Sequence, residues 1–523
     1  MEALLVWPEF PPTYWSYSYS LRLVGKRCLL PPLPLITVAA LLPADWKLRL
    51  VDLNAESLSD QQIRAADVVL ISGMLAQRRS MHQVIARCRA LGVRCAVGGP
   101  YATAVPEDFE AADHVFVGEA EGSIGEFCRQ LEQGRAPHRF QGLDKPPITD
   151  SPVPRYDLLN VDSYLHMALQ YSRGCPFSCE FCDIIVMYGR RPRVKAPEQV
   201  EAELDAIAAT GFRGSVFFVD DNFIGNKKEV RALIPHLRRW QERKDWPFFF
   251  YTEASLNLAD DEALMKSMVD AGFESVFIGI ESPSADSIAE MHKVQNMKGD
   301  IADRVHRILE HGMDVWAGFI VGFDSDTPSI FDEQYDLIEK AAIPFAMVGM
   351  LQALPGTALT RRLEKEGRLR PHIGTDQFGH VNFDTVLSDK TLVAGYRRLL
   401  QKVYEPRAYF DRVRAMLARR PQPRWRRRPT AAQIVSGARA LITQGLFAHY
   451  RLEYLRFLWK IWRWDSSRLV EALMRAGAGH HFIEYTRKVV APRLEAILNT
   501  ESLPALGGGA AAPPAVVCPD ESA

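Results

Sequence analysis

Short apolar runs alternate with amphipathic segments over the first 140 residues of the chain. The segments between the apolar runs repeat their apolar positions every three to four residues, as helices do, and they lie at residues 35–42, 59–66, 80–91 and 121–132. The apolar runs have the length of buried strands and lie at residues 3–7, 48–53, 68–73, 95–99 and 114–118. This order predicts a doubly wound, Rossmann-like α/β domain over residues 1–140.

The same alternation returns after a proline-rich linker at residues 141–164. Strand-like runs lie near residues 171–173, 215–220, 248–253, 275–281, 316–322 and 346–351, with helical patterns at 197–209, 227–243, 261–271, 301–311 and 330–340. Six such units predict a partial (β/α)6 barrel over residues 165–385. Only helical patterns follow, which predicts a helical C-terminal domain over residues 386–498. The Gly-, Ala- and Pro-rich residues 499–523 predict a disordered tail.

Small and acidic residues follow many of the predicted strands. Ligands of parallel sheets bind beyond the carboxyl ends of the strands, so these residues are candidates for cofactor binding. In the first domain they are Ser72, Gly73, Gly98, Gly99, Pro100 and Gly118, and no G-x-G-x-x-G accompanies them, which argues against a nicotinamide dinucleotide. In the barrel they are Asp220, Asp221, Asn222, Glu253 and Glu281, although an acid at a strand end can also cap the next helix.

Composition and charge narrow the range of binding partners that we expect for this chain. The net charge of −1 over 523 residues gives no general attraction to nucleic acid, and no apolar run of eighteen residues or basic leader is present, so we expect a cytoplasmic chain without a transmembrane segment. The tract at residues 419–429 holds six arginines and can bind phosphates, but a solvated linker is the commoner origin of such a tract.

A helical stripe in the C-terminal region leaves peripheral membrane contact open. It comprises Tyr450, Tyr454, Phe457, Leu458 and Ile461, with basic residues around it. Such a stripe can lie on a membrane surface, but a helix packed on its own domain produces the same pattern more often.

Three of the eight cysteines fall within eight residues, at Cys175, Cys179 and Cys182. Three thiolates on one loop can hold three corners of a cubane iron–sulfur cluster and leave one iron open to another ligand. Structural zinc usually takes four ligands in two pairs, and no partner pair lies nearby. A disulfide framework is disfavoured because the other cysteines are scattered singly, and cysteines that merely pack remain the third alternative.

The spacing Cys175-x3-Cys179-x2-Cys182, with Phe181 before the last cysteine, resembles the signature of the radical S-adenosylmethionine (radical SAM) superfamily. The resemblance implies a [4Fe-4S] cluster held by the three cysteines, whose open iron binds S-adenosylmethionine and whose electron cleaves it to a 5′-deoxyadenosyl radical. It also implies that the backbone of Phe181 lies by the adenine, and that Asp221 or Asn222 contacts the methionyl amino group. Glu253 and Glu281 would bind ribose hydroxyls or the methionyl moiety.

Beside this motif, the N-terminal domain resembles the cobalamin-binding domain of the cobalamin-dependent radical SAM class. Ser72-Gly73 and Gly98-Gly99-Pro100 match positions where that class lets backbone meet the corrin and its nucleotide tail. The D-x-H-x-x-G signature is absent, which implies a cobalt without a histidine ligand from the protein. The alternative is a degenerate domain that serves only as a scaffold.

These resemblances imply a methyltransferase acting on an unactivated carbon of a small or lipid-like metabolite, with an external flavodoxin- or ferredoxin-type electron donor. No residue is assigned to the catalytic step, and a nucleic-acid substrate is not expected. The nearest alternative is a cobalamin-using radical SAM cyclase or rearrangement enzyme. A tRNA methylthiotransferase would carry a second cysteine trio, whereas Cys28, Cys88 and Cys95 are widely separated. A non-catalytic iron–sulfur protein would normally complete its cluster with a fourth protein ligand.

Overall fold

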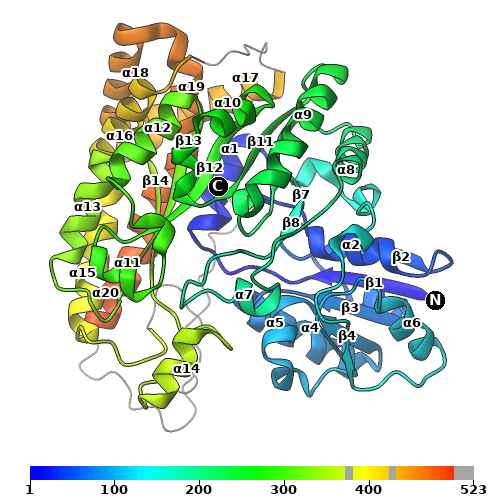
Figure 1. Ribbon diagram of the computed structural model, residues 1–523. Coiled ribbons are helices and arrows are strands. Elements are labelled where there is room, and N and C mark those ends of the chain that lie inside the picture. The colour runs from blue at the N-terminus through cyan, green and yellow to red at the C-terminus, as the bar shows by residue number, and fades with distance from the viewer. Residues whose placement is uncertain (371–380, 423–430, 500–523) are drawn as a thin grey trace.

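The computed structural model describes residues 1–370, 381–422 and 431–499, and Figure 1 shows two α/β units beside a block of helices. The predicted tail, apart from Asn499, lies outside the described residues, as do residues 423–429 of the basic tract. Both α/β units and the helical C-terminal region agree with the predicted architecture.

The first unit is a six-stranded parallel sheet in the order β2-β1-β3-β4-β5-β6. Its strands are β1 (Glu2–Trp7), β2 (Lys47–Asp52), β3 (Val68–Ser72), β4 (Arg94–Gly98), β5 (His114–Val117) and β6 (Arg139–Gln141). The covering helices are α2 (Leu33–Leu41), α3 (Asp60–Arg64), α4 (Arg78–Leu91), α5 (Gly99–Ala104) and α6 (Ile124–Glu132). Separate apolar cores lie on the two faces, which explains why β1 and β3 are apolar without alternation.

One strand of this sheet was not predicted. β6 has only three residues, of which Arg139 and Gln141 are exposed and Phe140 is half-buried. Such a short polar edge strand has too few apolar positions to give a pattern. It extends the first unit to Gln141, at the predicted start of the linker.

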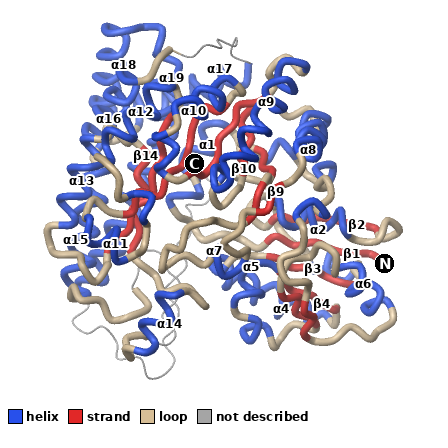
Figure 2. Tube along the Cα trace, in the orientation of Figure 1, coloured by secondary structure: helices blue, strands red, loops and turns tan. Residues whose placement is uncertain are grey.

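The second unit is a partial barrel with six parallel strands in the order β14-β13-β12-β11-β10-β7 (Figure 2). The strands are β7 (Met167–Leu169), β10 (Gly214–Phe218), β11 (Phe248–Ala254), β12 (Phe273–Glu281), β13 (Asp314–Val321) and β14 (Phe345–Met350). The helices between them include α8 (Pro197–Ala209), α9 (Lys227–Arg243), α10 (Glu262–Asp270), α11 (Ala285–Glu290), α12 (Ile301–His311) and α13 (Ile330–Lys340), and α14 (Ala358–Lys365) follows the last strand.

The first barrel strand differs from the prediction. Residues 171–173 were expected to be that strand, but β7 occupies its place a few residues earlier. Ser172 and Arg173 form β8, which pairs antiparallel with β9 (Arg193–Val194) outside the barrel. The short pair β8–β9 therefore forms a separate platform from which the cysteine loop starts.

The C-terminal region consists of α15 (Asp389–Val403), α16 (Pro406–Arg419), α17 (Ala431–Ile442), α18 (Arg451–Asp465), α19 (Leu469–Tyr485) and α20 (Ala491–Asn499), with the π-helical turn η10 (Thr443–Phe447) before α18. Tyr450, Tyr454, Phe457 and Ile461 of the predicted stripe are buried, so this stripe packs inside the domain. None of the described helices is long and apolar enough to cross a lipid bilayer.

The segment that follows β1 leaves the first unit and packs elsewhere. The helix α1 (Ser18–Val24) lies against α19, and the ring of Tyr14 stacks on Phe482 at 5.7 Å between centroids. The ring of Trp15 lies 5.1 Å from that of Phe277 on β12. Residues 14–24 thus join the barrel to the C-terminal helices, although the sequence pattern placed them within the first domain.

Candidate active site

The three predicted cluster cysteines lie on one loop between β8 and α7 (Ile184–Met187). Gly174 starts this loop with a φ of +97°, and a Cβ at this position would lie 2.9 Å from the carbonyl oxygen of Gly189. The backbone N–H of Cys175 donates to the same carbonyl at 3.3 Å, and the N–H of Cys182 donates to the carbonyl of Cys179 at 3.2 Å. Glycine is required at 174 because a side chain there would be strained and would collide.

Two side-chain amides from elsewhere in the barrel lie against the cysteine sulfurs. Asn222 Nδ2 is 3.8 Å from Cys175 Sγ, and Gln295 Nε2 is 3.8 Å from Cys179 Sγ. All three thiols are free of disulfides. Three cysteines on one loop, with amide donors aimed at two of their sulfurs, form a donor set that fits an iron–sulfur cluster.

The protein alone does not favour thiolates at this loop. Burial raises the pKa of the Cys182 thiol to about 12. It also raises the pKa values of Cys175 and Cys179, and the nearby Lys293 ammonium only partly offsets this rise. Bound iron would supply the positive charge that keeps the sulfurs ionised. Among the described residues, no three His, Cys, Asp or Glu side chains are gathered around a single ion position. In a cubane cluster each cysteine binds a different iron, so its ligands need not meet at one point.

The acids that follow β10 hold the start of the cysteine loop. The carboxylate of Asp220 accepts a hydrogen bond from the backbone N–H of Ser172, and Asp221 Oδ2 accepts one from the N–H of Gly174 at 2.8 Å. Burial raises the pKa of Asp220 to about 7 and that of Asp221 to about 6. Asn222 bridges from Cys175 to Ser255 Oγ, which lies 3.2 Å from its Nδ2. The contacts that we predicted for Asp221 and Asn222 with the methionyl amino group stay a prediction.

The ends of β11 and β12 place Glu253 and Glu281 at the same edge. Glu281 has a φ of +68°, and its carboxylate forms an ion pair with the buried Lys293. Glycine at 279 makes room for that pair, because a Cβ there would lie 2.6 Å from Lys293 Nζ. Burial, with contributions from Asp221, Asp220 and Glu281, raises the pKa of Glu253 to about 8. The edge thus combines a carboxyl that keeps its proton at neutral pH with a paired carboxylate and ammonium.

The predicted cofactor residues of the first unit meet at the carboxyl edge of its sheet. Gly99 has a φ of +89°, and a Cβ there would collide with Ser72 Oγ and lie 3.3 Å from the backbone nitrogen of Gly73. Gly118 has a φ of +99° and donates its N–H to Thr103 Oγ1 at 3.0 Å. A Cβ at Gly98 would meet its nearest atoms at 3.7 Å. Close packing between the strand-end loops therefore explains why residue 99 is a glycine. Pro100 stands in the first turn of α5. The edge as a whole offers backbone and small side chains, which fit a flat cofactor.

Two of the three histidines of the first unit, His114 and His138, stand at the opposite edge of the sheet. His82 lies on α4, with its ring stacked 5.4 Å from that of Phe109. His114 begins β5 at the amino edge, where it is hydrogen-bonded at 2.9 Å to the carbonyl of Pro137, and His138 precedes β6 at the same edge. The expectation that the cobalt receives no histidine from the protein stays a prediction.

A network of four charged side chains joins the two α/β units. Arg173 Nη2 lies 2.8 Å from Glu121 Oε1, and Arg173 also contacts Glu119. Arg193 Nη2 lies 2.7 Å from the other oxygen of Glu119. All four side chains are largely buried. Because Glu119 and Glu121 follow Gly118 and Arg173 precedes the cysteine loop, the network fixes the edge of the first sheet against that loop, where α5 contacts α7.

The sequence interpretation did not find Lys293, Gln295 or the partners of Arg173. Lys293 and Gln295 lie between α11 and α12, in a stretch without a motif, and reach the cysteines only through the fold of the barrel. Glu119 directly follows the predicted strand-end residue Gly118, but nothing in the sequence indicated that Glu119 pairs with two arginines of the second unit. For these residues, no local signal was available.

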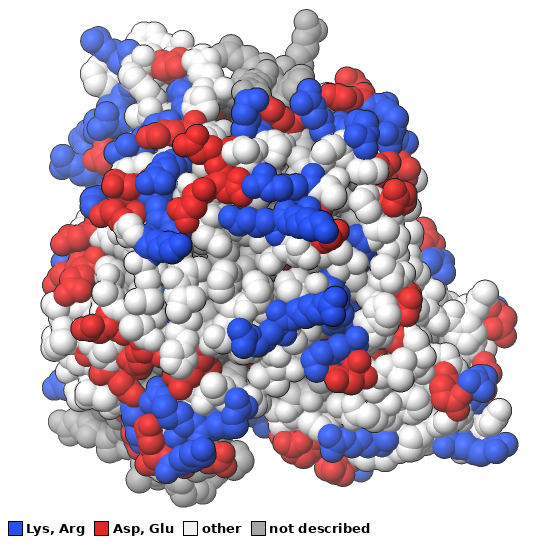
Figure 3. Space-filling model, in the orientation of Figure 1, with Lys and Arg blue, Asp and Glu red and all other residues white. Residues whose placement is uncertain are grey.

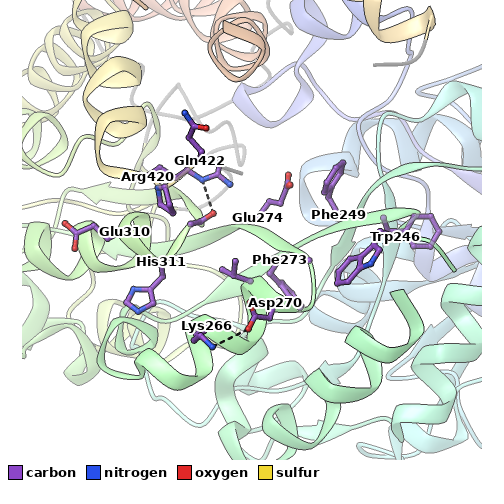
Figure 4. A pocket seen from close by; sticks show the side chains of 15 residues that line it. Trp246, Phe249, Lys266, Asp270, Phe273, Glu274, Glu310, His311, Arg420 and Gln422 are labelled. Atoms are coloured by element: carbon purple, nitrogen blue, oxygen red, sulfur yellow. Dashed lines mark hydrogen bonds and ion pairs between the residues drawn. The ribbon is translucent and has the colours of Figure 1, made fainter. Parts of the chain in front are cut away.

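A separate cavity of about 310 Å³ lies at the end of the barrel opposite the cysteine loop; Figure 4 shows its lining. Its lining includes Trp246, Phe248 and Phe273 at the amino ends of β11 and β12, together with Glu274 and Arg420. The cysteines and strand-end acids stand at the carboxyl ends, so this cavity is not part of the candidate active site.

Three family models match successive parts of the chain. A B12 binding domain matches residues 28–127, the radical SAM superfamily matches residues 169–338, and a domain of unknown function (DUF4070) matches residues 357–493. The first two matches cover the glycine-lined edge and the cysteine loop, respectively. They agree with the two α/β units described above.

Similar proteins match nearly the whole chain. An uncharacterized methyltransferase of Synechocystis sp. is 40% identical over 501 residues, which cover 94% of this chain and 92% of that protein. The hopanoid C-2 methylase of Rhodopseudomonas palustris is 36% identical over 499 residues, which cover 93% of each. The structure of the radical SAM methyltransferase TsrM from Kitasatospora setae, with cobalamin and a [4Fe-4S] cluster bound, has a TM-score of 0.61 at 14% identity and covers 91% of this chain and 99% of that one. The chain therefore belongs to the cobalamin-dependent radical SAM enzymes, whose cofactors are a [4Fe-4S] cluster, S-adenosylmethionine and cobalamin.

Proposed function

We propose that this enzyme transfers a methyl group to an unactivated carbon of an apolar, lipid-like metabolite. The observation that carries the substrate class is the aromatic interior of the barrel. The rings of Phe217 and Tyr251 stack at 4.6 Å between centroids, and those of Trp15 and Phe277 lie 5.1 Å apart. A surface of this kind binds apolar carbon skeletons by area and shape rather than by charge.

The strand pattern explains why the rings of Phe217, Tyr251 and Phe277 line the interior. Along β11 buried residues alternate with partly exposed ones, so that Phe249, Tyr251 and Glu253 share one face while the residues between them pack against the helices. Trp316, Gly318 and Ile320 share the corresponding face of β13. Polar groups gather at the carboxyl ends of the strands, and aromatic groups lie nearer their amino ends. This division suits a polar cosubstrate at the edge and an apolar substrate beside it.

The cofactors would be held by groups at the carboxyl edges of both sheets. Cys175, Cys179 and Cys182 would bind the cluster, and the strand-end loops that contain Ser72, Gly73, Gly98, Gly99, Pro100 and Gly118 would bind cobalamin. When bound, these groups supply the electron that cleaves S-adenosylmethionine to a hydrogen-abstracting radical, and a carrier for the methyl group. The backbone beside Phe181 and the carboxyl groups of Glu253 and Glu281 would bind S-adenosylmethionine.

The chain's own contribution is binding and orientation. Amides of Asn222 and Gln295 stabilise negative charge on the sulfurs, and Lys293 orients the Glu281 carboxylate. Glu253, which keeps its proton at neutral pH, can donate a hydrogen bond at the same edge. The Arg173 network holds the carboxyl edge of the first sheet, where cobalamin would bind, against the cysteine loop. A reaction between groups that are bound to two different units requires such a fixed arrangement.

We further propose that a flavodoxin- or ferredoxin-type protein delivers the electron beside α7. Arg190 and Arg191 are exposed on the loop that follows α7, and Figure 3 shows Lys and Arg side chains gathered over this part of the face. Basic residues near the cluster loop would attract an acidic electron carrier and accelerate the encounter. The similarity to a hopanoid methylase over almost the full length supports a lipid-like substrate.

Lipid and metabolite profiling of a deletion strain tests the proposed function. The mutant should accumulate a compound that lacks one methyl group relative to a compound of the wild type, and the active gene should restore the methylated form. A matched strain carrying a triple Cys→Ala variant should behave like the deletion. Unchanged lipid profiles together with loss of a tRNA or peptide modification would refute the proposed substrate class.

A further inference from the structure

Helix α18 carries two apolar faces, and only one of them is covered by the protein. On the covered face, the ring of Phe457 stacks on Phe410 of α16 at 4.9 Å between centroids. Leu452, Leu455, Trp459 and Trp462 follow at positions i, i+3, i+7 and i+10, which places them on one side of a helix. Trp459 and Trp462 are 57% and 59% exposed, and Leu452 is 63% exposed.

The exposed side of α18 continues onto η10. Leu446 and Phe447 are exposed there, Phe447 to 78%. A Cβ at Gly445 would lie 3.5 Å from Leu455 Cδ2, so the turn and the helix meet at this point. We call the set Leu446, Phe447, Leu452, Leu455, Trp459 and Trp462 the aromatic face. An exposed apolar surface of this kind on one element is typical of an interaction site.

Basic side chains border the aromatic face. Helix α18 holds four basic residues, Arg451, Arg456, Lys460 and Arg463, against the two acids Glu453 and Asp465. The guanidinium of Arg463 lies over the ring of Trp459 at 5.4 Å, while Lys460 pairs with Asp411 at 3.1 Å and Arg456 approaches Glu453 at 3.8 Å. Within the described part of the chain, no carboxylate lies within ion-pair distance of Arg451 or Arg463.

We propose that the aromatic face docks on the surface of an anionic phospholipid membrane. Tryptophan rings prefer the boundary between headgroups and acyl chains, leucine and phenylalanine side chains reach into that boundary, and arginines bind lipid phosphates. Basic residues next to exposed tryptophans therefore complement an anionic bilayer better than a neutral one. Helix α18 lies at the outer end of the helical block, away from the first unit (Figure 1), and the side chains of its aromatic face are exposed. This goes beyond the proposed methyl transfer, because docking requires neither cofactor nor substrate.

Vesicle flotation with the full chain tests the proposal. The protein should float with vesicles of phosphatidylcholine containing about one third phosphatidylglycerol and much less with phosphatidylcholine alone. Trp459→Gln with Trp462→Gln should lower the partition coefficient by roughly tenfold or more. Arg456→Gln with Arg463→Gln should lower it about fivefold per residue, and added salt should weaken wild-type binding in the same direction.

The control is an exposed apolar pair elsewhere, Val153→Gln with Val386→Gln, which should float like the wild type. Failure of the wild type to float with anionic vesicles would overturn the proposal, and so would unchanged flotation of the tryptophan variant. Sedimentation velocity addresses a second copy of the chain as the occupant: a wild-type dimer that the tryptophan variant converts to monomer, with flotation unaltered, would also overturn it. Because these measurements use protein without substrate, their failure is separable from failure of the methylation proposal.

Discussion

Replacing Arg173 by methionine should destabilise the protein through a carboxylate that the mutation leaves buried. Glu121 is almost fully buried, and Arg173 contacts it at 2.8 Å. Removing one partner of a buried ion pair typically lowers the free energy of unfolding by about 3–5 kcal/mol. Glu119 keeps Arg193, so the loss should arise mainly at Glu121. Because the pair joins the two α/β units, the first unit should also loosen from the cysteine loop.

The pH dependence of this loss is opposite to that of the wild-type pair. Burial alone would raise the pKa of Glu121, but Arg173 holds it below its usual value. In the wild type the pair therefore stabilises the fold above the unfolded pKa of about 4.3, and this stability is lost as the pH falls through the depressed folded pKa. In Arg173→Met the folded pKa should be raised instead, so the folded state loses stability as the pH rises above about 4.3. The gap between the two proteins should widen from pH 5 to pH 8.

Urea unfolding at several pH values measures this gap, with two controls. Arg155→Met breaks an exposed ion pair, in which the guanidinium of Arg155 lies 2.7 Å from the carboxylate of Asp157. This change should alter the free energy of unfolding by less than about 1 kcal/mol. The double variant Arg173→Met with Glu121→Gln should recover most of the loss, because the buried carboxylate that remains, Glu119, keeps its partner Arg193. A gap that stays constant with pH, or a double variant as unstable as the single one, would refute the reasoning.

Four further expectations follow from the two sheet edges. The triple alanine variant of the loop cysteines should lose about four irons per chain after anaerobic reconstitution and should release no 5′-deoxyadenosine; retention of the cluster would contradict the ligand assignment. Electron paramagnetic resonance of the Co(II) form should show no nitrogen splitting from a protein imidazole. Because the pKa of Glu253 is raised to about 8, the folded apoprotein should lose stability as the pH rises from about 4.3 to 8. Glu253→Gln should therefore raise the unfolding temperature more at pH 8 than at pH 5. An equal rise at both pH values would argue against a raised pKa. Gly279→Ala places a Cβ 2.6 Å from Lys293 Nζ and should weaken S-adenosylmethionine binding in calorimetry, whereas Gly349→Ala, with nothing within 4 Å, should not.

The sequence by itself determined the elements whose information is local. The helical patterns at residues 197–209, 227–243, 301–311 and 330–340 coincide with α8, α9, α12 and α13, because the period of 3.6 residues is contained within each segment. The cysteine spacing indicated the cluster for the same reason, since the three proposed ligands lie within eight consecutive residues. Strand ends were also identified, because a strand, a polar turn and a helix follow one another along the chain.

Only the tertiary structure decided which distant residues meet. Gln295 reaches a sulfur atom 116 positions away, and Glu121 pairs with an arginine 52 positions away. Residues 14–24 left their own unit for helices at the other end of the chain. The buried stripe of α18 was expected to pack, but the sequence did not indicate that the opposite side would stay uncovered. Such contacts depend on how whole elements pack on each other, and a periodic pattern reports that a face is apolar without specifying what covers it.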